Sequence, residues 1–96
     1  MSNNRRDPVL VTTEHRGVFF GYLNGRKPGK KQLTLERCRN CGFWSRPMGG
    51  FLGLATQGPD DECRVGPPAT KTTIYDITSA TEVSAKAVKK WETASW

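Results

Sequence analysis

The hydrophobic positions in the first half of the chain fall into three short runs that predict β-strands. Residues 9–11 and 18–23 are rich in Val, Leu, Phe and Tyr, and such runs favour strands. Residues 33–44 begin with apolar and polar side chains in alternation, which predicts a third strand that continues through a bulge at Gly42. The Asn-Gly pair at 24–25 predicts a hairpin turn, because both residues tolerate a positive φ.

The second half of the chain predicts two helices and one long strand. Residues 51–55 are enough only for a short helix, which would end before Gly58. Residues 70–83 are rich in Thr, Ile, Tyr and Val and are the longest strand candidate. Ser84 is a suitable N-cap for a final helix that has one apolar face. This face comprises Val83, Ala87, Val88 and Trp91.

Together these elements predict an α+β fold. It is a small, mostly antiparallel β-sheet with one short helix after the third strand and a C-terminal helix. A chain of 96 residues makes one domain with a small hydrophobic core. We expect residues 1–8 to form a flexible N-terminal arm and residues 9–96 to form the domain. Small polar domains often gain the missing burial by association, so a homo-oligomer is expected.

Basic side chains are concentrated in the first half of the chain. The net charge is +6, and residues 1–50 hold ten basic and three acidic side chains, against five and six in residues 51–96. This distribution favours anionic partners such as nucleic acid or free nucleotides, although solubility alone explains it equally well. No apolar run approaches the roughly 18 residues of a membrane span, and no apolar segment of signal-peptide length follows the N-terminus. A cytoplasmic protein without a membrane partner is therefore expected.

The three cysteines raise the question of a metal site. Cys38 and Cys41 form a C-x-x-C pair, and Cys63 and His15 could complete a zinc site of three thiolates and one imidazole. A zinc ribbon has two close-spaced pairs, whereas this chain has one, so free thiols are favoured and no bound metal is expected. A thioredoxin-like role has less support still, because no βαβ unit surrounds the pair.

Catalytic chemistry has little support in the sequence. His15, the single histidine, has no serine or cysteine at a recognisable motif spacing. The acidic residues 60–62 are more typical of a solvated loop than of a cation site. Gly49, Gly50 and Gly53 match neither a P-loop nor a dinucleotide fingerprint. We therefore expect a protein that is not an enzyme and that holds no cofactor.

The segment 33–51 concentrates the side chains that bind nucleotides. Arg37 and Arg39 are two apart, so in a regular strand they would project from one face. Trp44 and Phe51 flank a glycine turn, and aromatic faces stack on bases while arginines pair with phosphates. The glycine pair before the short helix could present free N–H groups to a phosphate. The alternative is that the aromatic side chains belong to the core and the arginines to the surface.

Several stretches resemble a family of small, mostly phage-encoded proteins that form a domain of unknown function. Residues 9–11 and 17–23 are similar to the opening strands of the family, and residues 35–44 to its segment rich in Arg and Trp. Residues 49–58 resemble the helix that follows, and residues 73–87 resemble its long last strand and the start of the next helix. Some members are Thoeris anti-defence proteins, sponges that bind cyclic ADP-ribose signal molecules.

The sequence departs from the family pattern at several of these positions. Residues 62–65 still resemble a short strand of the family. Asn40 replaces an arginine and Gly42 replaces a tryptophan. Cys38 and Cys41 stand where the family has Ala and Ile, which favours buried positions for both thiols.

The resemblance implies a phage-type, non-catalytic protein that binds and sequesters a small cyclic nucleotide. Its site would lie between the subunits of a homo-oligomer, because so short a chain rarely encloses a pocket of that size. Arg39 and Arg64 would pair with phosphates, and Trp44 or Phe51 would stack on the base. The predicted ligand-binding residues are Arg39, Asn40, Trp44, Gly49, Gly50, Phe51 and Arg64.

Two other functions remain open from the sequence. The domain could bind single-stranded nucleic acid, with its basic loop 26–31 following the phosphates. It could also bind a host protein through a sheet edge or through Trp91 and Trp96. Salt dependence separates the first of these from a sponge, because a polymer held at several phosphates loses affinity steeply as salt rises.

Overall fold

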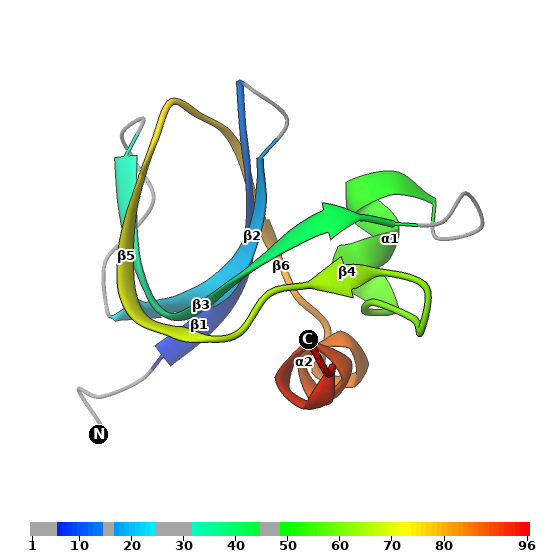
Figure 1. Ribbon diagram of the computed structural model, residues 1–96. Coiled ribbons are helices and arrows are strands. Elements are labelled where there is room, and N and C mark those ends of the chain that lie inside the picture. Colours follow the sequence, from blue (N-terminus) through cyan, green and yellow to red (C-terminus); the bar gives the residue numbers. More distant parts are fainter. Residues whose placement is uncertain (1–5, 15–16, 25–31, 45–48) are drawn as a thin grey trace.

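The computed structural model describes residues 6–14, 17–24, 32–44 and 49–96 of the chain. These residues form an antiparallel sheet, a short helix after the third strand and a C-terminal helix (Figure 1), which confirms the predicted α+β class. The elements in chain order are β1 (Arg6–Thr13), β2 (Val18–Asn24), β3 (Gln32–Phe43), α1 (Gly50–Thr56), β4 (Arg64–Val65), β5 (Ala69–Tyr75), β6 (Ile77–Glu82) and α2 (Ala85–Thr93).

The sheet curls because its two edges are joined by almost continuous chain. The strand order is β4-β3-β2-β1-β6, and β5 pairs with the first part of β3. β5 and β6 therefore lie at opposite edges, although Asp76 alone separates them along the chain. Asp76 adopts a left-handed φ of 57°, which redirects the chain and divides the strand predicted over 70–83 into two. Figure 1 shows β5 arching over to β6, so that the strands surround a barrel-like space.

Each face of the sheet packs against its own hydrophobic core. The inner core fills the curled sheet, and the outer core lies between the sheet and the two helices. In β1, Val9 and Val11 belong to the inner core and Leu10 to the outer one, so three consecutive apolar residues are buried. Trp91 of α2 stacks on Phe20 with the ring centroids 5.1 Å apart and contributes to the outer core. The other inner-core residues are Leu23, Leu33, Leu35, Cys38 and Ile74.

A bulge in β3 changes which side chains share a face of the sheet. Tyr22 pairs with Glu36 and Phe20 pairs with Arg39, so β3 has one extra residue between these pairs. Arg37 adopts a φ of 51° at this point and is exposed, whereas Arg39 is buried. The two arginines therefore differ in burial, and the bulge interrupts the regular alternation from which a shared face was predicted.

The helices lie close to their predicted ranges. Ser84 caps α2, since its Oγ accepts a hydrogen bond from the Ala87 N–H at 3.1 Å and donates one to the Thr56 carbonyl at 2.7 Å. This second bond links the start of α2 to the last residue of α1.

At the other end of the chain, β1 begins at Arg6, so residues 6–8 of the predicted arm pair with β2.

Some predicted features lie outside the described residues, namely His15, Gly25 and the basic loop 26–31. The flanking strands β2 and β3 pair antiparallel, as a hairpin requires. Within the described part of the chain, neither helix is long and apolar enough to cross a membrane.

Candidate functional site

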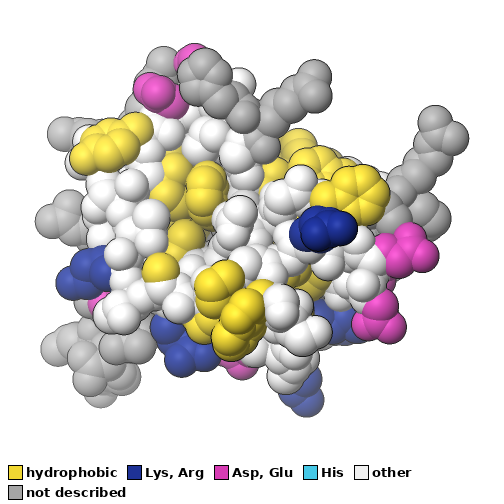
Figure 2. All heavy atoms as spheres, viewed as in Figure 1, with side chains coloured by type: hydrophobic (Ala, Val, Ile, Leu, Met, Phe, Trp, Pro, Cys, Tyr) yellow, Lys and Arg dark blue, Asp and Glu magenta, His cyan; other side chains and the backbone are white. Residues whose placement is uncertain are grey.

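A pocket lined by aromatic side chains, glycines and two threonines lies where β3 ends beside α1. We call it the aromatic pocket, and its volume is about 590 Å³. Figure 2 shows hydrophobic side chains gathered over the end of β3 and α1, with a basic side chain in front of them over β4. The lining residues are Thr12, Gly17, Val18, Gly42, Phe43, Trp44, Phe51 and Thr78.

The end of β3 supplies two neighbouring aromatic side chains. The register between β3 and β4 shifts between Cys41 and Phe43, which confirms the bulge predicted at Gly42. Cys41 is buried in the outer core, whereas Phe43 is 51% exposed and Trp44 is half-buried. The bulge thus marks the point where β3 leaves the core and begins to line the pocket.

The third aromatic side chain comes from α1. Phe51 lies in the first turn of this helix and packs, half-buried, against the outer core. Gly49 and Gly50 precede it with φ of 80° and 73°, a conformation that glycine adopts without strain. The positive φ angles explain why glycine occupies both positions. The predicted contact of Gly49 and Gly50 with a phosphate stays a prediction.

Two threonines on the neighbouring strands β1 and β6 add hydroxyl groups to the lining of the aromatic pocket, and we call this pair the threonine wall. Thr12 of β1 and Thr78 of β6 share a hydrogen bond of 2.8 Å between their hydroxyl oxygens. The Thr12 hydroxyl also contacts the Ser79 hydroxyl at 2.5 Å. Hydroxyls both donate and accept hydrogen bonds, so this wall can pair with polar groups of a ligand whose ring lies against the aromatic wall.

Arg64 adds positive charge at the edge of the aromatic pocket. It is exposed on β4 and pairs in register with Phe43. Side chains of directly paired strand residues start about 5 Å apart, so the guanidinium can reach an anionic group of a ligand held against Phe43. The structure therefore brings together three of the predicted site residues, Trp44, Phe51 and Arg64.

Arg39 is held by the backbone in the interior of the protein. Its side chain is 3% exposed, and its Nε donates to the Gly66 carbonyl at 2.7 Å. Nη1 donates to the Trp91 carbonyl at 2.5 Å and Nη2 to the Ala94 carbonyl at 2.7 Å. The ring of Trp96 covers the guanidinium at 5.7 Å, and burial, followed by the nearby Arg37, lowers the pKa of Arg39.

These contacts give Arg39 a structural role, because one guanidinium donates hydrogen bonds both to carbonyls at the end of α2 and to a carbonyl just after β4. Asn40 lies at the same place, since its carbonyl accepts a hydrogen bond from the Gly66 N–H at 2.9 Å. Neither residue lines the aromatic pocket. The ligand-binding roles predicted for Arg39 and Asn40 stay predictions.

The cysteines of the C-x-x-C pair lie in different cores. Cys38 belongs to the inner core and Cys41 to the outer one, because residues three apart along a strand point to opposite faces of the sheet. Within the described residues, no cluster of three or more Cys, His, Asp or Glu side chains could hold a metal ion. All three thiols are free of disulfide bonds.

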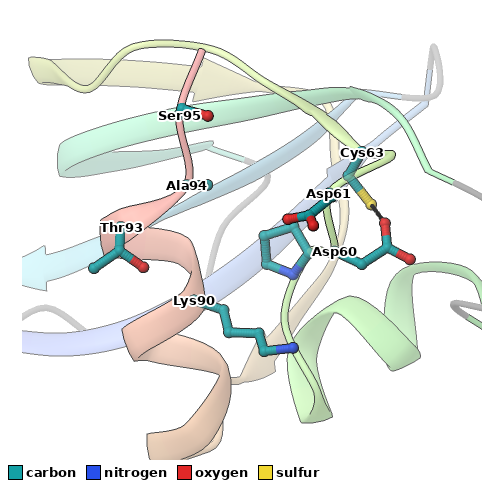
Figure 3. A pocket seen from close by; sticks show the side chains of 8 residues that line it. Asp60, Asp61, Cys63, Lys90, Thr93, Ala94 and Ser95 are labelled. Carbon is teal, nitrogen blue, oxygen red and sulfur yellow. Dashed lines mark hydrogen bonds between the residues drawn. The ribbon is translucent and has the colours of Figure 1, made fainter.

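A second pocket, of about 490 Å³, lies between the C-terminal end of α2 and the loop that precedes β4 (Figure 3). We call it the polar pocket. Asp60 shapes the loop, since its Oδ1 accepts hydrogen bonds from the Glu62 N–H at 3.0 Å and from the Cys63 thiol at 3.3 Å. The carboxylates of Asp60 and Asp61 and the Lys90 ammonium from α2 line the same space, so the polar pocket contains charges of both signs. Its other lining residues are Pro59, Thr93, Ala94 and Ser95.

The sequence did not point to the threonine wall. Thr12 and Thr78 are 66 positions apart and meet only because β6 pairs with β1. Phe43 was a detectable candidate, since it is the aromatic neighbour of Trp44 in a segment already singled out. No pattern in the sequence marks Thr78 as part of a site.

A protein-family model described as a domain of unknown function (DUF6948) matches residues 6–91. The chain belongs to the DUF6948 family. The DUF6948 match begins at the first residue of β1 and ends at Trp91, so it includes both cores and every residue that lines the aromatic pocket. No curated protein and no solved structure matches the chain. Because the description of DUF6948 names no activity, the function has to be argued from the site.

Proposed function

We propose that this protein binds a small nucleotide-like ligand in the aromatic pocket and does not change it chemically. The observation that supports the proposal is the arrangement of Phe43, Trp44 and Phe51 around one pocket, with Arg64 paired to Phe43 at its edge. An aromatic base would stack on these rings, and a phosphate would pair with the guanidinium.

The dimensions of the aromatic pocket suit such a ligand. Small-molecule sites have volumes of about 300–1,000 Å³ and combine apolar walls with a few polar groups, and this pocket has about 590 Å³. Stacking of one base on an aromatic side chain contributes about 1–3 kcal/mol. The hydroxyls of Thr12 and Thr78 would select among ligands by hydrogen bonding to the edge of the base.

The lining of the aromatic pocket favours binding over catalysis. Among the described residues that line it there is no carboxylate, imidazole, thiol or amine. General acid–base and covalent catalysis need such a group within hydrogen-bonding reach of the reacting atoms. Sequestration of a ligand needs affinity alone.

A more specific proposal concerns the biological role of ligand binding in the aromatic pocket. We infer from the resemblance that the ligand is a signal nucleotide related to cyclic ADP-ribose, and that a phage-type protein of this kind counters host defence by sequestering it. A homo-oligomer would complete the site, since the half-exposed Phe43 leaves part of the aromatic surface open to a second subunit. Support for this role comes from the pocket and from the lack of acid–base groups in its described lining.

A second candidate is binding of single-stranded nucleic acid. It is favoured by the exposure of Phe43 beside Arg64, because an open aromatic ring next to a cation can stack on successive bases of a strand. The excess of basic side chains in residues 1–50 would then supply further phosphate contacts.

Calorimetric titration with cyclic ADP-ribose, AMP and a short single-stranded DNA tests both candidates. We expect saturable binding of a free nucleotide, weakened about tenfold or more by Trp44→Ala and by Phe51→Ala. Trp96→Ala is the matched control, because Trp96 is 77% exposed and does not line the aromatic pocket. The Trp96→Ala variant should bind the nucleotide with the same affinity as the parent protein.

Salt and charge variants separate the outcomes. Arg64→Ala should weaken binding of a phosphate-bearing ligand, whereas Lys71→Ala, an exposed cation on β5, should not. Binding of DNA that falls steeply with salt, without binding of either nucleotide, would favour the second candidate. If neither nucleotides nor DNA bind, the proposed function is wrong.

A further inference from the structure

Two cysteines that are far apart in the sequence lie side by side in the outer core. Cys41 is on β3, and Cys63 is in the loop that leads into β4, where Val65 pairs in register with Cys41. Cys63 packs against the core cluster that contains Cys41, and the two side chains are close enough for each sulfur to affect the other. Cys63 is two residues before Val65, so it is the contact between the two sulfur atoms, and not the strand register, that places them where a disulfide can form.

The two thiols differ in their access to solvent. Cys41 is 4% exposed, and its thiol donates to the Phe43 carbonyl at 3.2 Å. Cys63 is half-buried and lines the polar pocket, and its thiol donates to the Asp60 carboxylate, as drawn in Figure 3. A small oxidant that enters the polar pocket therefore meets the Cys63 thiol, whereas the buried Cys41 thiol does not line that pocket.

We propose that Cys41 and Cys63 are an oxidisable thiol pair that closes to an intrachain disulfide when the protein reacts with a hydroperoxide. In the first step the Cys63 sulfur, as thiolate, attacks one peroxide oxygen. The O–O bond breaks, the S–O bond of a sulfenic acid forms, and an alcohol or water leaves. In the second step the Cys41 sulfur attacks the Cys63 sulfur, the S–O bond breaks, and water leaves as the S–S bond forms. The two thiols lose two electrons and two protons, and the hydroperoxide is reduced.

Cys38 is excluded from this pair by its position. It faces the inner core, on the other side of the sheet from Cys41, although it is nearer to Cys41 in the sequence. The C-x-x-C spacing would suggest that Cys38 and Cys41 pair, so the structure and the sequence pattern predict different disulfides.

The disulfide would close a loop over residues 42–62, which includes the aromatic side chains Trp44 and Phe51 and all of α1. Fixing the two ends of this segment restricts the unfolded chain, so the unfolding equilibrium constant should fall about a hundredfold. An effect of oxidation on ligand affinity rests on the proposed function of the aromatic pocket, whereas formation of the disulfide does not.

The test is treatment of the full chain with hydrogen peroxide, followed by thiol titration under denaturing conditions and non-reducing peptide mapping. We expect the number of free thiols to fall from three to one, with Cys41 and Cys63 in the cross-linked peptide and Cys38 free. Cys38→Ala is the matched control and should form the same bridge, whereas Cys63→Ser and Cys41→Ala should form none.

Three results would overturn the proposal. They are a bridge that includes Cys38, cross-links only between chains, and oxidation of Cys63 that stops at a sulfenic or sulfinic acid. Urea denaturation of oxidised and reduced protein gives a second readout, in which the oxidised parent is stabilised and the treated Cys63→Ser variant is not. Absence of nucleotide binding in both the reduced and the oxidised protein, with the Cys41–Cys63 bridge formed, would contradict the proposed function and leave this inference standing.

Discussion

The structural role of Arg39 differs from the phosphate-binding role that an arginine in a basic segment suggests. In a basic segment its guanidinium is a candidate phosphate ligand, yet three of its nitrogen atoms donate to carbonyls of Gly66, Trp91 and Ala94. Two of these carbonyls lie at the end of α2, where backbone acceptors lack partners within the helix. Arg39 therefore does for α2 what a C-cap does for other helices.

Removal of Arg39 should lower the stability of the whole domain. Arg39→Ala leaves three carbonyls without a donor in a buried place, so we expect the free energy of unfolding to fall by about 3 kcal/mol. Arg37→Ala is the matched control, because Arg37 is exposed, and its effect should stay within about 0.5 kcal/mol. Urea denaturation measures both. A stable Arg39→Ala variant that has lost ligand affinity would contradict the structural role and favour the ligand-binding prediction.

Cys41 should make the protein less stable at alkaline pH. Burial first, and the neighbouring Cys63 and Asp60 with it, raise the pKa of this thiol from 9.0 to about 11, against a lowering by the Phe43 carbonyl. Below pH 9 the folded and unfolded chains both keep the proton, so the full stability is present. Between pH 9 and about 11 the unfolded chain loses the proton and the folded chain keeps it, so the free energy of unfolding falls, by about 2 kcal/mol.

Urea denaturation between pH 8 and 10.5 measures this decline. Burial also raises the pKa of Cys38, and burial with the Glu92 hydrogen bond raises that of Tyr22. These two groups therefore also lower the free energy of unfolding at alkaline pH, and their contribution remains when Cys41 is replaced. Cys41→Ala should decline less than the parent over this range. Equal declines in the two proteins would show that Cys41 does not titrate as described.

At the scale of elements, the turn between β5 and β6 determines how the sheet closes. Asp76 has a left-handed φ of 57°, and its carbonyl accepts a hydrogen bond from the Glu14 N–H at 3.0 Å. Asp tolerates this conformation better than most residues because its short polar side chain can bond locally. The conformation lets β5 leave the β3 edge and β6 join the β1 edge.

Substitution at Asp76 should follow backbone preference. Asp76→Gly should leave stability unchanged or raise it by up to about 1 kcal/mol, because glycine adopts a positive φ without strain. Asp76→Val should lower it by about 2 kcal/mol, because a β-branched side chain is strained there. Both variants keep the Glu14 hydrogen bond, so thermal or urea unfolding reports the backbone effect alone. Equal stability of the two variants would be the opposite of what the φ angle predicts.

The sequence predicted those elements whose residues follow a simple period or carry a cap. Ser84 and the apolar face up to Trp91 predicted α2, and the apolar runs predicted β1, β2 and β3. The bulge at Arg37 and the turn at Asp76 were missed, because a left-handed residue other than glycine leaves no trace in the hydrophobic pattern. These two missed positions determine the faces of β3 and the closure of the sheet.

At the scale of the whole molecule, one curled sheet with a core on each face lets a short chain bury many apolar side chains. The site depends on this arrangement, since its aromatic wall comes from β3 and α1 and its threonine wall from β1 and β6. Residue chemistry was enough to single out Trp44 and Phe51, which line the aromatic pocket, and Arg64, which pairs with Phe43. The threonine wall and the buried position of Arg39 follow from long-range strand pairing, which local sequence does not specify.

The three tryptophans provide the most direct test that the aromatic pocket binds the ligand. In a ¹H–¹⁵N spectrum each indole N–H gives one signal, and Trp91, whose Nε1 donates to the Leu54 carbonyl at 3.1 Å, and the exposed Trp96 serve as internal references. A base stacked in the aromatic pocket should shift the Trp44 signal on titration with cyclic ADP-ribose or AMP and leave the other two in place. A shift confined to Trp96, or an unmoved Trp44 signal at millimolar nucleotide, would contradict the proposed site.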